Sequence, residues 1–509
     1  MLIGSFVFVA LLIVALTINL SSTPPLWWDE GWTLSVARNW LELGHYGRLL
    51  NGQLVPRGLE AAFPVTASIA LSFATFGVGI VQARLVAVVF TLATLLILYE
   101  LARRFYGSVV GIATLVCLIL LSGHADINPV IAGRQVMAEF PAMLFLLAGY
   151  LCLLLAERRP LLHMPLAIGF WTLALFTKAQ VQPFWVCSLV VPLMLSLLRS
   201  EWRFVWLLGI SLVCSAAAFL GLQYYWNSIM PSSSVSGLTQ VIALVFFKHT
   251  RMGVVAETLR FGIPTLVGLC WAVWRFLSKG SKMESHVEMV HVSFLILAAS
   301  WFMWYETLSL GWPRYFLPPA LLSSMFVAAM LYQWTGKFSL AYTVERSTHL
   351  LKTFRVDQRS FTALFAVVLV AMSLGRTLTI LYDAYVLKPD RSVMDTLRFL
   401  NTQTPANALI ETYESELFFL LQRRYHYPPD QVHVDLIRRN SLGHRVNIDY
   451  DPVDTNPDYL VVGRQSKFWD FYDPYLETGA FRSIREKGRY EIFERVRQPN
   501  DTKFEHNRQ

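Results

Sequence analysis

The feature that most constrains this chain is a series of apolar segments, each about as long as a bilayer is thick. A helix needs about 20 mostly apolar residues to cross the hydrocarbon core. Eleven such segments are 3–20, 82–102, 107–125, 138–156, 163–179, 181–199, 203–222, 253–277, 288–308, 314–334 and 361–383. Charged residues make up only 15% of the chain, against about 25% in soluble domains. The sequence therefore predicts an α-helical polytopic membrane protein with about 11–13 transmembrane helices.

Basic residues in the loops set the expected orientation. They fall in alternate loops, and loops rich in Lys and Arg stay in the cytoplasm. The net charge of +8 is explained in this way, without a nucleic-acid partner. An odd number of spans then places the N-terminus in the cytoplasm and the C-terminal part outside a cell (inner) membrane. The residues on which this orientation depends are Arg103, Arg104, Arg158, Arg159, Arg199, Arg203, Arg275, Lys279, Lys282, Lys337, Arg346, Lys352, Arg355 and Arg359.

Two other segments are apolar but are not expected to cross the membrane. A span at residues 61–78 would turn Arg103 and Arg104 outward, so we expect a juxtamembrane or re-entrant helix within a first external loop, residues 21–80. Residues 334–360 mix apolar and basic side chains. They fit an amphipathic cytoplasmic linker on anionic lipid, or a solvated loop.

The composition changes from about Pro389, and we divide the chain just before this point into a membrane domain (1–384) and a C-terminal domain (385–509). Short runs with period two, alternating with helical patterns, predict a small extracytoplasmic α/β domain. The expected helices are 392–401, 414–423 and 466–477, and the expected strands are 408–412, 431–434, 459–462, 481–485 and 490–496.

The first external loop begins with a carboxylate pair among tryptophans, in the sequence Pro24-Pro25-Leu26-Trp27-Trp28-Asp29-Glu30-Gly31-Trp32. Proline ends the preceding helix, and tryptophan favours the lipid–water boundary. Asp29 and Glu30 are thus expected near the membrane surface. One interpretation is structural: Asp29 caps the next helix and Glu30 is favoured by its dipole. The other is catalysis by a carboxylate fixed at the helix start.

Further ionisable residues gather on the same external face, where charges at membrane depth suggest function. Each has a structural alternative, namely an Arg134–Glu139 ion pair, a Lys178 that snorkels to the interface, or an Arg314 that binds lipid headgroups. Together they supply cations that bind a phosphate leaving group and carboxylates that accept a proton. The candidate catalytic residues are Asp29, Glu30 and Glu139; the candidate lipid-phosphate ligands are Arg134, Lys178, Arg314 and Tyr315.

A series of short motifs resembles the GT-C superfamily of polyprenyl-phosphate-sugar-dependent glycosyltransferases, which includes the protein O-mannosyltransferases and the lipid A aminoarabinose transferase. The motifs lie in family order over about the first 330 residues. They are Trp28-Asp29-Glu30; Phe76-Gly77 with Arg84-Leu85; Arg103-Arg104-Phe105-Tyr106-Gly107; Gly133-Arg134 with Glu139-Phe140-Pro141; Thr177-Lys178; and Arg314-Tyr315 with Leu317-Pro318. One departure concerns Glu60, which is followed by Ala61 where the aminoarabinose branch has Lys-Pro.

The resemblance implies a GT-C fold and a role for each candidate. Asp29 would be the catalytic base, Glu139 a second acid facing the same cavity, and Arg314, with Lys178 or Arg134, would face the lipid phosphate. The expected reaction is inverting sugar transfer from a polyprenyl-phosphate donor to a hydroxyl of a lipid, glycan or protein. The sequence fixes no cofactor. Glu60 and Glu139 are candidate ligands for a divalent metal, although no ligand-spacing motif accompanies them. The alternatives are a transporter or flippase of a lipid-linked glycan, which predicts mid-membrane charges and an internal repeat, and a non-catalytic membrane scaffold.

Overall fold

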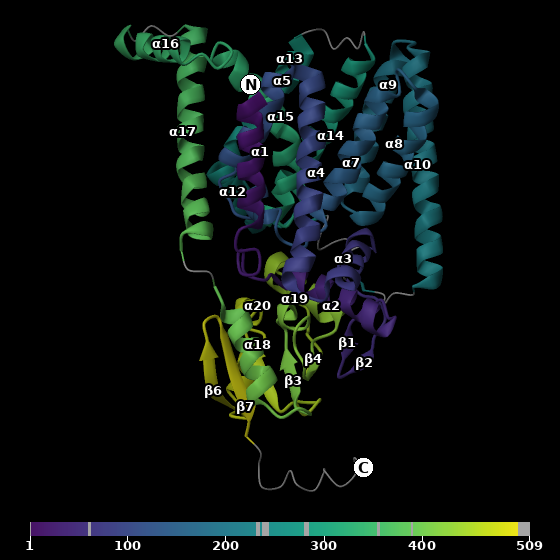
Figure 1. Ribbon diagram of the computed structural model, residues 1–509, viewed down its shortest axis with the longest axis vertical. Coiled ribbons are helices and arrows are strands. Elements are labelled where there is room, and N and C mark those ends of the chain that lie inside the picture. Colours follow the sequence, from purple (N-terminus) through teal and green to yellow (C-terminus); the bar gives the residue numbers. More distant parts are fainter. Residues whose placement is uncertain are drawn as a thin grey trace.

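The computed structural model describes residues 2–59, 63–230, 235–236, 244–278, 285–353, 357–387 and 390–496. A bundle of long helices forms one end of the molecule, and a five-stranded sheet with its helices forms the other (Figure 1). The N-terminus and the sheet lie at opposite ends of the bundle (Figure 1). The chain is a multi-pass membrane protein, as its apolar segments predicted.

Eight helical segments of the described residues are long and apolar enough to cross a bilayer. They are α4 (Ile80–Tyr106), α8 (Pro160–Thr177), α9 (Val181–Leu198), α10 (Trp202–Ile229), α12 (Lys248–Glu257) continuing through η1 (Thr258–Gly262) into α13 (Ile263–Ser278), α14 (His286–Leu308), η2 (Pro313–Phe316) continuing into α15 (Leu317–Trp334), and α17 (Gln358–Tyr385).

Three of the eleven expected spans form shorter helices: α1 (Leu2–Thr17), α5 (Ser108–Leu120) and α7 (Glu139–Leu155). At a rise of about 1.5 Å per residue, α5 is about 20 Å long, less than the hydrocarbon core of about 30 Å. Between α5 and α7 the chain forms a loop that contains the short helix α6 (Pro129–Ala132). Asn128 caps this helix, because its side-chain oxygen accepts a hydrogen bond from the Val130 amide at 3.0 Å.

The first loop forms α2 (Trp28–Leu43), a small hairpin of β1 (Leu49–Leu50) and β2 (Gln53–Leu54), and α3 (Phe63–Phe76). Figure 1 shows α2 and α3 at the end of the bundle nearest the sheet. With 14 residues, α3 is too short to cross the core, which agrees with the juxtamembrane helix expected at 61–78. The linker at 334–360 contains the helix α16 (Leu340–Thr353), which lies at the other end of the bundle, next to α17 (Figure 1).

The C-terminal part contains the strands β3 (Leu409–Thr412), β4 (Arg424–His426), β5 (Tyr459–Val462), β6 (Phe481–Lys487) and β7 (Tyr490–Arg495). They lie in the order β4-β3-β5-β7-β6, where β3 is parallel to β4 and β5 and the pairs of β7 are antiparallel. The helices are α18 (Ser392–Gln403), α19 (Asp430–Leu442), α20 (Arg464–Phe468) and α21 (Asp473–Leu476). The small α/β unit predicted from the sequence is present.

Two local predictions in this part are wrong. Residues 431–434 belong to α19, because the alternation of Val432 and Val434 continues into Leu436 and Ile437, which make one buried helical face; a four-residue window does not separate the two periods. Residues 414–423 form only the short turn η3 (Ser415–Leu417), further turns at 418–420 and irregular chain before β4. This stretch packs against α2, so tertiary contact overrides its helical propensity.

Candidate active site

The start of α2 fixes the two acidic residues in different places. The helix begins at Trp28, so Trp27 is the N-cap and Asp29 lies within the first turn; the expectation that Asp29 caps the helix is wrong. Glu30 reaches back and accepts a hydrogen bond from the Trp27 amide at 3.3 Å. This arrangement satisfies an amide that a helix start leaves without an internal partner. It turns Glu30 inward and leaves Asp29 on the other side of the turn.

Glu30 is fully buried and forms a bidentate ion pair with Arg84 of α4. Both N–O distances of this pair are 2.7 Å. The remaining Arg84 donor binds the carbonyl oxygens of Leu20 and Pro24 at 3.0 and 2.8 Å. The Val136 amide adds a hydrogen bond to Glu30 at 3.3 Å. Glu30 thus joins the first loop, α4 and the 133–138 loop, which fits a positioning role better than the proton-accepting role that the sequence suggested.

Asp29 lies on a cavity of about 300 Å³ at the end of the bundle that faces the sheet. Its side chain is 35% exposed and forms an ion pair with Arg314 of η2. The Arg314 guanidinium lies 4.8 Å from the ring centre of Trp312 and 5.4 Å from that of Tyr315. The two aromatic rings therefore hold Arg314 beside Asp29. We call this space the Asp29 cavity.

A second ion pair lines the same cavity. Lys178, which follows α8, donates to Glu139 at the start of α7 over 2.8 Å. The Lys178 ammonium lies 5.8 Å from the ring centre of Tyr315. The cavity thus brings together five of the seven predicted site residues: Asp29, Glu139, Lys178, Arg314 and Tyr315.

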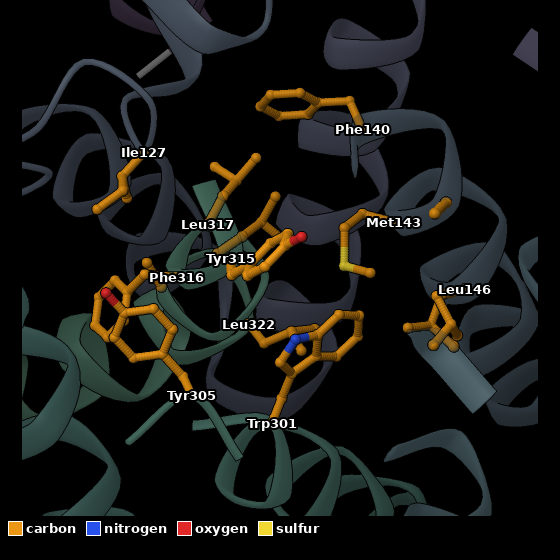
Figure 2. Packing of buried hydrophobic residues seen from close by; sticks show 14 of the residues in the cluster. Ile127, Phe140, Met143, Leu146, Trp301, Tyr305, Tyr315, Phe316, Leu317 and Leu322 are labelled. Atoms are coloured by element: carbon orange, nitrogen blue, oxygen red, sulfur yellow. The ribbon is translucent and has the colours of Figure 1, made fainter. Parts of the chain in front are cut away.

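Buried aromatic residues fix the turn that carries Arg314. Figure 2 shows Tyr315 and Phe316 packed among Leu317, Tyr305 and Trp301. The Tyr305 and Phe316 ring centres are 4.9 Å apart in an edge-on arrangement. The Tyr305 hydroxyl donates to the Gly311 carbonyl, just before the turn, at 3.3 Å. Such contacts hold a side chain in one geometry without using its charge.

The C-terminal part contributes a wall of the Asp29 cavity that the sequence did not reveal. His433 of α19 lines it and stacks on Trp28, with ring centres 4.8 Å apart. The His433 Nδ1 atom is 2.5 Å from the Tyr413 hydroxyl, and the Trp28 indole donates to the Tyr413 carbonyl at 2.7 Å. Burial, with the nearby Arg314 and Arg48 charges, lowers the pKa of His433 to about 3, so the imidazole is neutral at physiological pH.

Gly31 explains why the two parts pack so closely. A Cβ at this position would lie 2.1 Å from the Glu416 Cα atom, so a side chain does not fit. The Ser415 hydroxyl donates to the Trp28 carbonyl at 2.5 Å beside this contact. The C-terminal unit is thereby fixed against the first turn of α2, directly beside Asp29.

Besides Glu30, whose pairing with Arg84 is described above, two candidate residues remain, Arg134 and Glu60. Arg134 is buried outside the cavity lining, where it donates to the Ile18 carbonyl and lies 5.4 Å from the ring centre of Tyr385. It does not pair with Glu139, which binds Lys178 instead. Glu60, a candidate metal ligand, lies outside the described residues. Within the described ranges, no group of three or more His, Cys, Asp or Glu side chains is placed to hold a metal ion.

Comparison with known proteins shows what this architecture is. No protein-family model matches the chain, and no curated protein matches its sequence. Among solved structures, ArnT from Cupriavidus metallidurans bound to undecaprenyl phosphate is similar, with a TM-score of 0.62 and 16% identity over 97% of this chain and 98% of that one. The archaeal oligosaccharyltransferase AglB from Archaeoglobus fulgidus, in complex with an inhibitory peptide and a dolichol-phosphate, gives 0.51 and 12% over 98% and 75%. The chain therefore has the fold of ArnT and AglB, as the resemblance of its sequence motifs predicted.

Proposed function

We propose that this protein is a membrane glycosyltransferase that moves a sugar from a polyprenyl-phosphate donor to an acceptor hydroxyl. The observation that carries the proposal is the Asp29 cavity, where Asp29 and Glu139 lie with Arg314 and Lys178. Proteins with a similar fold bind the lipid phosphate that such a donor would leave behind: the ArnT structure holds undecaprenyl phosphate and the AglB structure holds dolichol-phosphate.

The proposed step is an in-line displacement at the anomeric carbon. The acceptor oxygen forms a bond to this carbon while its proton passes to the Asp29 carboxylate. The bond between the anomeric carbon and the phosphate oxygen breaks, and the electron pair leaves with the phosphate. Arg314 and Lys178 stabilise the charge that develops there. Attack opposite to the leaving group inverts the anomeric configuration.

The Asp29–Arg314 ion pair gives the reaction a built-in order. A guanidinium binds phosphate in the same two-pronged way in which it binds carboxylate. A donor phosphate that engages Arg314 competes with Asp29 for it and leaves the carboxylate free to accept a proton. The Lys178–Glu139 pair offers the same exchange on the facing wall.

The proposed membrane arrangement follows from the loop charges. The Asp29 cavity opens at the external face of a cell (inner) membrane, while the N-terminus and α16 face the cytoplasm. Residues 1–384 form the catalytic membrane domain, and residues 385–509 form an external domain whose residue His433 completes the cavity wall. A lipid, a glycan or a protein serves as the acceptor.

Proteoliposomes that contain a radiolabelled polyprenyl-phosphate sugar and membrane extract as acceptor source test this proposal. The wild type is expected to release polyprenyl phosphate. Lys178→Gln is expected to lose about 10²-fold or more in rate, by analogy with the loss of one charge-stabilising donor. Lys248→Gln, which removes an exposed cation outside the cavity lining, is the matched control and is expected to keep full activity. Movement of intact donor across the bilayer without its cleavage would instead indicate a transporter.

A further inference from the structure

The bundle contains a second and larger cavity at the end opposite to the Asp29 cavity. Its volume is about 620 Å³, within the range of ligand-binding pockets. It lies where α4 and α13 end, where α14 begins, and where α15 turns toward α16. We call it the Arg275 cavity. Figure 1 shows α13 and α16 at this end, on the side of the N-terminus.

The lining of the Arg275 cavity is apolar and aromatic with a basic edge. Apolar surface comes from Phe105, Val110 and Phe276. The Arg275 guanidinium lies 5.3 Å from the ring centre of Trp271. Aromatic and aliphatic walls of this kind suit hydrocarbon and the glycerol region of a lipid.

Two cations at the edge are not neutralised by a carboxylate. Arg275 donates to the side-chain oxygen of Gln333 at 2.5 Å, and neither Arg275 nor Lys337 forms an ion pair with any residue that the structure describes. The acidic residue in the lining, Glu288, accepts from the Ser285 amide at 3.2 Å and so caps α14. With two cations and one carboxylate in its lining, the cavity presents a net positive charge beside apolar surface.

The helix α16 supplies an independent sign of lipid at this face. Leu340, Val344 and Leu351 are more than half exposed, at 77%, 52% and 58%. At 100° per residue they fall within about 40° of one another, so they form one apolar stripe. The turn that leads into α16 begins at the cavity edge, because Gly336 and Lys337 line the cavity. Gly336 also packs on Tyr342 of α16, where a Cβ would lie 2.8 Å from the ring. An amphipathic helix with exposed leucines lies in the interface of a membrane.

We propose that the Arg275 cavity binds an anionic phospholipid of the leaflet on the N-terminal side. The phosphodiester lies between Arg275 and Lys337. The parts of the acyl chains nearest the headgroup contact the aromatic wall, and α16 lies on the same leaflet. Basic pockets between transmembrane helices suit such headgroups because charge attraction and apolar burial act together. This site is separate from the Asp29 cavity and does not depend on the proposed transfer reaction.

Native mass spectrometry of the full-length protein tests the proposal. Purified protein is mixed with equal amounts of phosphatidylglycerol and phosphatidylcholine, and the retained lipid is measured. The wild type is expected to prefer phosphatidylglycerol roughly tenfold, given the attraction of two cations. Arg275→Gln with Lys337→Gln is expected to bind both lipids equally. The matched control, Arg158→Gln with Arg159→Gln, removes two exposed cations at the same end outside the cavity and is expected to keep the preference.

Three results would overturn the site. They are an equal retention of both lipids by the wild type, an unchanged preference in the Arg275 and Lys337 variant, and displacement of phosphatidylglycerol by excess inorganic phosphate, which would indicate a free-phosphate site. Arg275→Lys keeps the charge and is expected to keep at least half of the preference. It separates loss of charge from loss of the fold, so a poorly folded glutamine variant does not leave the question open.

Discussion

Replacing each of the two adjacent carboxylates by its amide is expected to separate folding from catalysis. Glu30 is fully buried and pairs with a fully buried Arg84. Glu30→Gln leaves the Arg84 charge in the interior without a counter-charge, which costs about 3–5 kcal/mol. Asp29 is 35% exposed in its pair with Arg314, and a partly exposed pair contributes about 0–1 kcal/mol. The two neighbouring substitutions thus differ by at least about 2 kcal/mol.

Thermal unfolding in detergent, followed by tryptophan fluorescence, measures this difference. The entropy of unfolding near the midpoint is about 2.1 cal/mol/K per residue, so in a chain of 509 residues 1 kcal/mol shifts the midpoint by about 1 °C. We therefore expect Glu30→Gln to melt at least about 2 °C below Asp29→Asn. Asp29→Asn is expected to melt close to the wild type. The double variant Glu30→Met with Arg84→Met removes both charges and is expected to regain part of the loss. It does not regain all of it, because the Leu20 and Pro24 carbonyls lose their donor.

A Glu30→Gln protein as stable as the Asp29→Asn protein would refute this reasoning, because the buried ion pair would then contribute nothing. Donor turnover in Glu30→Gln does not decide this point, because a positioning role and a direct catalytic role both predict its loss.

Three further predictions concern the contact between the two parts of the chain. The lowered pKa of His433 means that the unfolded chain binds a proton below about pH 6.5 while the folded chain does not until about pH 3. Stability is therefore lost as pH falls through this range, and His433 alone lowers the free energy of unfolding by about 2 kcal/mol at pH 5. Between pH 7 and pH 5 the melting temperature of the wild type is therefore expected to fall further than that of His433→Gln. Gly31→Ala is expected to destabilise by about 1–3 kcal/mol, because its Cβ meets Glu416, whereas Gly169→Ala, with open space around the Cβ, is expected to be neutral or stabilising in the same melting assay. Because His433 lines the Asp29 cavity, His433→Ala is expected to lower donor turnover at pH 7; unchanged turnover would show that this wall is only structural.

The sequence predicts the membrane fold well because apolar length and loop charge are local properties. The eight long apolar helices, the short helix α3 and the sheet strands at 409–412 and 459–462 all follow from such patterns. Local patterns are weaker where packing decides. Residues 414–423 and 431–434 were assigned to the wrong element because contact with α2 and a continuing helical face determine their structure.

The site shows the same division. The residue types at positions 29, 139, 178 and 314 were found because charges at helix ends are costly near a membrane. The pairing of these residues does not follow from the sequence. Glu139 at the start of α7 binds Lys178, which follows α8, and Arg134 donates to a backbone carbonyl instead. The sequence does not predict the position of His433, because this residue lies 404 residues after Asp29 in the chain and reaches the cavity only through the docking of α19. A neutral histidine within an apparent strand carries no local signal for such a position.

The measurement that tests the central claim most directly is donor turnover by the purified protein beside its Asp29→Asn variant. A panel of radiolabelled polyprenyl-phosphate sugars is supplied with membrane extract as acceptor source, and released polyprenyl phosphate is counted. We predict that the wild type consumes at least one donor and that the folded Asp29→Asn protein is slower by about 10²–10⁴-fold, the usual contribution of a general base. Full activity in the folded variant would contradict the role of Asp29, and no turnover of any donor by the wild type would contradict the glycosyltransferase itself.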